Sequence, residues 1–249
     1  MDKQYNDFHK DSRIQKKLIN KNNFTYRLII KELEKVLSNI KKNKVNILDY
    51  GCGVGTLDFY LASTGNNVTG VDISSLSIEL CERSAREMNL GDRVRFSVNS
   101  DFWKRVNITN SKFDLIICSE VIEHVRNDTI LLRNLLKVLN KGGYIFLTTP
   151  SNNAPLFKMG IADSFDNKVG HLRRYDVESL ISTFEKIGMR VENVRKVEGI
   201  LRNSLFIIPI LEFFIKFLKG FLSDIVTFVD ELIVPIFGES NIFIVAKKI

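Results

Sequence analysis

The stretch ILDYGCGVGT, residues 47–56, places Gly51, Gly53 and Gly55 directly after an apolar run that contains Asp49. Glycine lets the backbone turn sharply and approach a ligand closely, so glycines at the end of a strand are typical of a loop that holds a nucleotide or an anionic group. A dinucleotide loop has the spacing G-x-G-x-x-G, and its third glycine would fall here at Thr56. The spacing therefore favours a nucleotide-like cofactor other than a nicotinamide dinucleotide.

A second group of reactive side chains lies in SEVIEHV, residues 119–125, which contains Glu120, Glu123 and His124. On a helix, positions i, i+3 and i+4 share one face, so we expect the two carboxylates and the imidazole to converge. His171 lies in GHLRRYD, within the connection that follows the fifth predicted strand. An imidazole titrates near neutral pH, which makes His124 or His171 a candidate general base. The alternative is that these histidines only bond backbone carbonyls or form the wall of a pocket.

The elements that must position these side chains alternate along the chain. We predict strands over residues 45–50, 67–74, 93–98, 113–119, 144–150, 190–197 and 241–248. We predict helices over residues 24–40, 57–64, 74–90, 127–139 and 176–187. Apolar strands that alternate with helices indicate an α/β fold, a Rossmann-like seven-stranded and mostly parallel sheet with helices on both faces, in a single domain of residues 1–249. Ligands bind such sheets beyond the carboxyl ends of the strands, where both motifs fall.

Asp72 ends the second predicted strand in GVDIS, and an acid at this place can accept hydrogen bonds from both hydroxyls of a ribose. The glycine loop and Asp72 are followed by FDLIICSEVIEHV and LNKGGYIFLTTP. In this order and spacing, the motifs resemble the class I S-adenosylmethionine (SAM)-dependent methyltransferases over residues 24–199 and 241–248. The E-x-x-E-H run with a later histidine is similar to two branches, the ubiquinone-biosynthesis O-methyltransferases (methyltransferase type 11) and the small-RNA 2′-O-methyltransferases.

The resemblance implies that the cofactor is SAM. Asp49 would accept a hydrogen bond from the SAM ammonium, the amides of the glycine loop would meet the SAM carboxylate, and Asp72 would bind the ribose. The other residues that the resemblance assigns to the SAM site are Arg27, Ile73, Ser100, Asp101 and Ser119. Among these, Arg27 would bind the methionine carboxylate through its guanidinium, and Ser100 or Asp101 would accept from the adenine amino group.

The resemblance also implies a divalent metal held by Glu120, Glu123, His124 and His171. Carboxylates together with imidazoles suit zinc, manganese or iron better than magnesium. Such a metal would orient a substrate hydroxyl and lower its pKa. Without a metal, Glu120, His124 and His171 remain the candidate catalytic residues.

The composition indicates which classes of partner and which cellular setting to expect. The formal net charge is +7, but the basic residues are spread along the chain, so the sequence disfavours nucleic acid as a partner. Three cysteines without a C-x-x-C pair disfavour a disulfide framework and favour a reduced, cytoplasmic setting. The polar N-terminus has no apolar segment of the kind that predicts a signal peptide.

Two segments flank the predicted sheet, an N-terminal helical arm (residues 1–41) and an apolar helical insertion (residues 200–238). The insertion has polar residues at steps of three and four, namely Glu212, Lys216, Lys219, Ser223, Thr227 and Asp230. This spacing predicts one helix from Pro209 to Pro235, about 36 Å long, which Gly220 is able to break in two. The rest of the surface of this predicted helix is apolar and must be buried against another surface. The alternatives are a lid on the active site, a homodimer, and a peripheral membrane contact through residues 205–237.

Together, these patterns predict SAM-dependent methylation of a hydroxyl on a hydrophobic small molecule, such as a quinone precursor or a lipid. The alternatives are 2′-O-methylation of RNA ribose and non-catalytic SAM binding. A basic, aromatic-bearing channel would favour RNA, whereas an apolar pocket formed by the insertion would favour the small molecule.

Overall fold

The computed structural model of the protein describes residues 13–109, 112–215, 217–218 and 220–249. Its core is a seven-stranded sheet with the order β3-β2-β1-β4-β5-β7-β6. The strands are β1 (Asn46–Tyr50), β2 (Asn67–Asp72), β3 (Val94–Val98), β4 (Phe113–Ser119), β5 (Leu139–Pro150), β6 (Met189–Val197) and β7 (Asn241–Lys248). β7 pairs antiparallel with both β5 and β6, and the pairs from β3 through β5 are parallel. The predicted sheet is confirmed, and its strand order reverses between β1 and β4, where such folds bind ligands.

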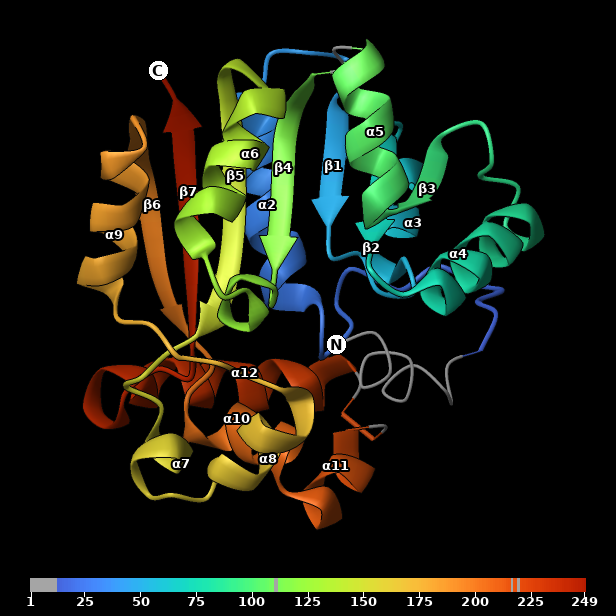
Figure 1. Cartoon of the computed structure of the whole chain (residues 1–249). Helices are drawn as coiled ribbons and strands as arrows, with labels where there is room; N and C mark the ends of the chain where they lie inside the picture. The colour runs from blue at the N-terminus through green and yellow to red at the C-terminus, as the bar shows by residue number, and fades with distance from the viewer. Residues whose placement is uncertain (1–12, 110–111, 216, 219) are drawn as a thin grey trace.

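Helices cover both faces of the sheet, as predicted. One face carries α2 (Arg27–Asn39), α3 (Thr56–Ser63) and α4 (Ser75–Glu87), and the other carries α5 (Asn99–Thr109), α6 (Asp128–Val138) and α9 (Val177–Lys186). The remaining helices gather at the carboxyl end of the parallel strands, at the bottom of Figure 1: α7 (Pro155–Lys158), α8 (Asp163–Val169), α10 (Ile200–Ile207), α11 (Pro209–Ile215) and α12 (Gly220–Phe237). Residues 1–12 of the predicted arm lie outside the described residues.

The local sequence explains most of these elements. In β4, Leu115, Ile116, Ile117 and Cys118 are fully buried, as expected for a parallel strand covered on both faces. β5 begins earlier than predicted because Leu139 already pairs with Phe113 before the register shifts. We did not predict α5.

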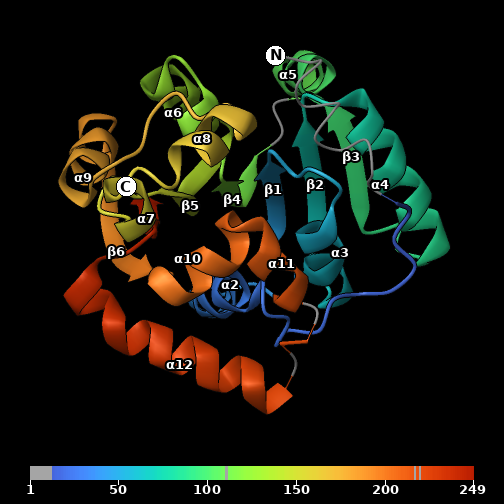
Figure 2. The same cartoon turned by 90° about the horizontal axis from the view of Figure 1, so that it is seen from below.

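In the described part of the insertion, the span from Pro209 to Pro235 forms two helices, α11 and α12, rather than one continuous helix. The predicted break occurs near Gly220, which begins α12 with a φ of +54° that favours glycine. Pro235 does not end α12, which continues to Phe237. Figure 2 shows α12 lying across the outside of α10 and α2.

The polar stripe of α12 faces the protein, and its apolar side faces outward. Ser223, Thr227 and Asp230 are buried, whereas Phe221 and Phe228 are 78% and 63% exposed. The side chains of Glu212, Lys216 and Lys219, which complete the predicted stripe, lie outside the described residues. Among the helices described, no segment has the length and apolar character needed to cross a membrane.

Arg202 on α10 is the group around which the polar stripe packs. Its side chain is completely buried, with the guanidinium carbon 4.2 Å from the centre of the Phe24 ring. Its guanidinium donates to the backbone carbonyl of Phe24 at 2.8 Å, to Thr227 Oγ1 at 3.2 Å and to Glu198 Oε1 at 3.3 Å. Asp230 accepts from the backbone amides of Gly199 and Arg202 at 2.7 Å and 3.0 Å, which joins α12 to the start of α10.

We expect Arg202→Met to lower the free energy of unfolding by about 3 kcal/mol, because it leaves Glu198 without its buried cation. Urea unfolding measures this loss. Arg190→Met is the control, since Arg190 forms an exposed pair with Glu192 at 2.7 Å. An exposed pair contributes at most about 1 kcal/mol, so equal losses in the two variants would contradict this account of Arg202.

Candidate active site

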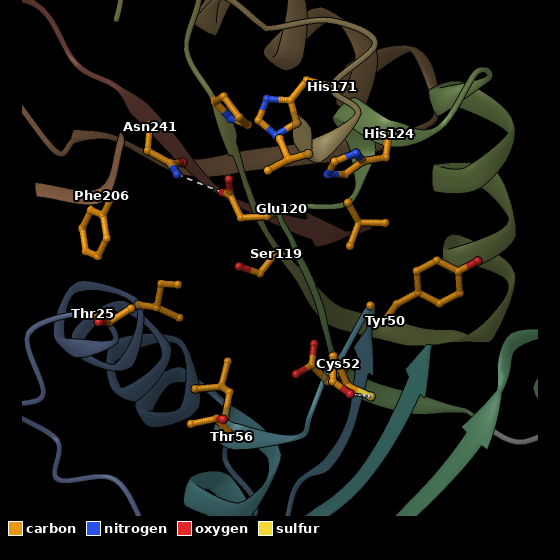
Figure 3. Close-up of a pocket in the computed structure, with 18 of the residues that line it drawn as sticks. Thr25, Tyr50, Cys52, Thr56, Ser119, Glu120, His124, His171, Phe206 and Asn241 are labelled. Atoms are coloured by element: carbon orange, nitrogen blue, oxygen red, sulfur yellow. Dashed lines mark hydrogen bonds between the residues drawn. The ribbon is translucent and has the colours of Figure 1, made fainter. Parts of the chain in front are cut away.

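A cavity of about 780 Å³ opens at the carboxyl ends of β1 and β4. Its walls come from the glycine loop, from the ends of β2, β4, β5 and β7, and from α2, α8 and α10. Figure 3 shows residues of the glycine loop on one side and His124, His171 and Glu120 on the other. Both motifs identified from the sequence therefore face one cavity.

The glycine loop turns directly beneath this cavity. The amides of Gly51 and Cys52 both donate to the Val71 carbonyl, at 2.7 Å and 3.1 Å, which ties the loop to β2. Gly51 has a φ of +90°, and a Cβ there would lie 2.2 Å from Val121 Cγ2. Gly51 and Gly53 line the cavity together with Asp49.

Gly55, predicted to bind the cofactor, lies outside the cavity lining. It precedes α3 with a φ of +76°, and a Cβ there would approach Cys81, Phe59 and Phe96 to within 3.0–3.1 Å. Its requirement for glycine therefore comes from the turn into α3 and from packing.

Asp72 lies where an acid for the ribose was predicted, and Ile73 beside it also lines the cavity. The Asp72 carboxylate accepts from the Gly53 amide at 2.9 Å and from the Ser74 amide at 2.8 Å. These bonds fix the side chain against the glycine loop, and the remaining lone pairs of the carboxylate are available to hydroxyls.

The residues predicted for the adenine end are displaced by one or two positions. Ser100 and Asp101 lie on α5 outside the cavity lining, and Asp101 pairs with Lys104 at 3.5 Å. Asn99 lines the cavity instead and accepts from the Tyr50 hydroxyl at 3.0 Å. The sequence reasoning missed Asn99, although it is the first residue after β3.

Arg27 also lies elsewhere than predicted. Its guanidinium binds Ser223 Oγ at 2.8 Å and the Asp224 carboxylate, so it ties α2 to α12 rather than lining the cavity. The two preceding residues, Thr25 and Tyr26, line the cavity.

Asp49, the acidic residue that precedes the glycine loop, has a raised pKa. Burial raises the pKa of Asp49 to about 7, with a further rise from the charge of Asp72, although a hydrogen bond with Asp58 acts in the opposite direction. Burial also raises the pKa of Asp58 well above its usual range, and the charge of Asp49 adds to the rise. A SAM ammonium beside Asp49 would favour the ionised carboxylate.

We expect the ligand-free protein to lose stability as the pH rises from about 4 to about 7, because a carboxyl with a raised pKa stabilises the folded state in its protonated form. The stabilisation from protonated Asp49 is complete below the pKa of this carboxyl in the unfolded chain. It is lost as the pH rises through the pKa in the folded protein. Urea unfolding at a series of pH values measures the decline, which Asp49→Asn should reduce. An unchanged slope in that variant would assign the effect to other groups.

The helical arrangement predicted for SEVIEHV is wrong. Only Ile122–His124 form a single 3₁₀ turn, and Glu120 has a φ of +54°. Glu120 Oε1 accepts from Thr148 Oγ1 at 2.8 Å and from Asn241 Nδ2 at 2.9 Å, away from Glu123. Ser119, which lines the cavity, shares a hydrogen bond of 2.8 Å with Thr148.

Glu123, His124 and His171 do converge, with potential ligand atoms within 4.8 Å of one another. Nδ1 of His124 lies 3.1 Å from the Gly170 carbonyl, and Nδ1 of His171 lies 2.9 Å from Asp166 Oδ1. These partners favour the tautomer with a proton on Nδ1, which leaves each Nε2 as an acceptor. Glu120, the fourth predicted ligand, falls outside this cluster.

Burial favours the uncharged forms of Glu123 and His124. Burial raises the pKa of Glu123 well above its usual range, and Glu120 adds to the rise. Glu123 Oε2 accepts from Thr149 at 3.0 Å, but Oε1 has no hydrogen-bond partner among the described residues. Burial also lowers the pKa of His124. A buried carboxylate oxygen beside two oriented imidazoles fits either a divalent cation or a proton-accepting site.

Comparison with known proteins identifies the family of the chain. Residues 21–194 match the sequence model of a family described as a methyltransferase domain. The chain belongs to the SAM-dependent methyltransferases. The methyltransferase has SAM as its cofactor, in agreement with the glycine loop and the position of Asp72.

Several similar curated proteins are ubiquinone biosynthesis O-methyltransferases. The ubiquinone biosynthesis O-methyltransferase of Glaesserella parasuis is 32% identical over 114 residues, which cover 45% of this chain and 48% of that protein. The protein of the same name from Pelagibacter ubique is 27% identical over 180 residues, 71% of each chain. The methyltransferase spans about half the length of several of these relatives.

A solved structure agrees with the fold of the methyltransferase. Magnesium protoporphyrin IX methyltransferase from Synechocystis, with bound S-adenosylhomocysteine (SAH), aligns with a TM-score of 0.61 and 13% identity, over 99% of this chain and 94% of that chain. At this identity the likeness shows the fold alone.

Proposed function

We propose that the protein transfers a methyl group from SAM to a hydroxyl of a hydrophobic small molecule, such as a quinone precursor or a lipid. The observation that carries the proposal is that His124 and His171, which converge with the buried Glu123, line the same cavity as the glycine loop. The ubiquinone O-methyltransferase relatives support an oxygen acceptor.

In this proposal the protein aligns two reactants and removes a proton. Bound SAM supplies a methyl that its sulfonium makes electrophilic. Asp72 and Asn99 orient the nucleoside end, and Asp49 beside the glycine loop orients the methionine end. Nε2 of His124 or His171 accepts the proton of the acceptor hydroxyl as its oxygen attacks the methyl. The Gly170 carbonyl and Asp166 hold the two rings in orientation for this step.

A divalent metal is compatible with the same cluster. Glu123, His124 and His171 would hold it, and its chemistry would be to lower the pKa of the acceptor hydroxyl. Glu120 is not part of this proposed ligand set because its Oε1 accepts from Thr148 and Asn241.

The walls of the cavity support an apolar acceptor. Phe165 and Val169 of α8 and Phe206 and Ile207 of α10 line it, which supports the alternative in which part of the insertion covers the active site. Incubation with SAM and a long-chain alkyl catechol, followed by mass spectrometry, tests the proposal. A product heavier by one methylene unit supports it. Methylation only of an RNA oligonucleotide would favour the alternative acceptor, and no product with any acceptor would favour a non-catalytic SAM binder.

The outward apolar side of α12 supports an association through residues 205–237, with either a second copy of the chain or a membrane surface. We expect Phe221→Ser with Phe228→Ser to abolish this association and to leave SAH affinity unchanged, because both side chains lie on the outer side of α12. Sedimentation velocity detects a dimer, and flotation with lipid vesicles detects membrane binding. If the unaltered protein shows neither, this surface has no such role.

A further inference from the structure

Five polar residues that methyl transfer does not use lie on the cavity wall. They are Glu120 after β4, Glu198 and Asn203 around the start of α10, and Ser240 and Asn241 at the start of β7. We call them the acidic subsite. Figure 3 shows Glu120 and Asn241 pointing toward each other, with Phe206 on the same side of the cavity.

The backbone at both carboxylates is strained. Among the residues that the structure describes, three non-glycine residues have a positive φ: Asn89, Glu120 at +54° and Glu198 at +59°. Asn89 follows the end of α4, where asparagine tolerates this conformation. Glutamate does not favour it, and such strain persists where the surrounding structure holds it, often at binding sites.

Backbone hydrogen bonds hold both strained residues. The Glu120 amide donates to the Thr148 carbonyl at 3.1 Å, and the Ser240 amide donates to the Glu198 carbonyl at 2.6 Å. These bonds to β5 and to the residue before β7 hold the main chain of both residues at the cavity wall.

The hydrogen bonds of the acidic subsite leave acceptors without donors. Asn203 Oδ1, Asn241 Oδ1 and Ser240 Oγ are buried and have no hydrogen-bond partner among the described residues. The side-chain amide of Asn241 donates through Nδ2 to Glu120, and this bond leaves its oxygen, Oδ1, as the atom without a partner. Buried acceptors without partners are costly, and a bound group that donates hydrogen bonds would satisfy them.

The charge of the acidic subsite determines which charge its ligand can carry. Glu198 accepts from Arg202, whereas Glu120 Oε1 accepts from two neutral donors, Thr148 and Asn241. Burial raises the pKa of Glu198, Arg202 lowers it, and Glu120 raises it again, which indicates that the two carboxylates sense each other. An anionic group would be repelled here, and a hydroxyl or an ammonium would be accepted.

We propose that the acidic subsite binds a hydrogen-bond-donating, non-anionic group of the methyl acceptor, either hydroxyls or an ammonium, at a distance from the oxygen that is methylated. The apolar part of the acceptor then lies against Phe206 and Ile207. This inference rests on the proposed function, and it defines the acceptor as amphipathic, with a second polar end. The competing occupant of the subsite is the ammonium of SAM itself.

The test uses the full chain saturated with SAH and three probes with the same tail: octyl β-D-glucopyranoside, octylamine and octanoate. Ligand-detected NMR titration below micellar concentrations gives each affinity. We expect the glucoside or the amine to bind at least about tenfold more tightly than octanoate, since tenfold corresponds to about 1.4 kcal/mol. Tighter binding of the glucoside assigns the subsite to hydroxyls, and tighter binding of the amine assigns it to an ammonium.

Glu120→Gln and Asn203→Leu, on separate elements, should each weaken the preferred probe about tenfold, and Glu185→Gln, an exposed change on α9, should not. Equal binding of octanoate, no binding of any probe, or a loss of SAH affinity in Glu120→Gln without a change in probe affinity would overturn the inference. If the unaltered protein does not bind SAH, the proposed function fails and this inference fails with it.

Discussion

Gly51→Ala is expected to reduce SAH affinity by at least about a hundredfold, which corresponds to about 2.7 kcal/mol. A left-handed backbone costs a residue with a Cβ roughly 1–2 kcal/mol. The new Cβ would also lie 2.2 Å from Val121 Cγ2, so the loop or Val121 must move. Either movement disturbs the two hydrogen bonds from the loop to the Val71 carbonyl and changes the cavity wall that Gly51 and Gly53 form. Isothermal titration calorimetry measures the loss.

Gly91→Ala is the matched control, because no atom lies within 4 Å of a Cβ built there. It should bind SAH as the unaltered protein does. If Gly51→Ala bound SAH with unchanged affinity, the glycine loop would not be the cofactor loop.

His171→Ala is expected to lower kcat by about 10²–10⁴-fold, the usual contribution of a positioned general base or of an equivalent proton acceptor. SAH affinity should change little, because the imidazole cluster lies across the cavity from the glycine loop (Figure 3). Methyl transfer to the alkyl catechol, measured by mass spectrometry, reports kcat.

The pH dependence of kcat/KM tests whether His124 is the general base. Burial lowers the pKa of this imidazole, and the nearby His171 lowers it further, although the Gly170 carbonyl acts in the opposite direction. The neutral form accepts a proton, so kcat/KM should rise with pH, with a midpoint below the ordinary histidine pKa of about 6.5. His124→Gln should remove this ionisation from the profile. A rate that remains dependent on the same ionisation in that variant would assign the base elsewhere.

Much of the fold follows from local patterns that tertiary contacts do not override. Apolar runs such as Leu115–Cys118 can be buried only in a sheet covered on both faces, so strands and their alternation with helices are predictable. The placement of Asp49, Asp72 and His171 near one cavity follows from the same rule, since the carboxyl ends of parallel strands share an edge.

The errors arise where long-range contacts determine local structure. Glu120 leaves the expected helical face because its amide pairs with Thr148 on β5, which no periodicity within SEVIEHV reveals. Arg27 binds Ser223 and Asp224, nearly 200 residues away, and lies outside the cavity lining. The spacing of the polar stripe on α12 is visible in the sequence, but the burial of that stripe depends on Arg202 in another helix.

The most direct test of the central claim is calorimetric titration of chelator-stripped protein with SAH, with and without zinc and manganese. The account predicts binding with one SAH per chain, and this binding should survive removal of the metal because the glycine loop and Asp72 form the site. If one metal ion binds per chain and His171→Ala no longer binds it, the cluster of Glu123, His124 and His171 is a metal site. Absence of SAH binding under all of these conditions would contradict the assignment of the cavity to SAM and, with it, the proposed methyl transfer.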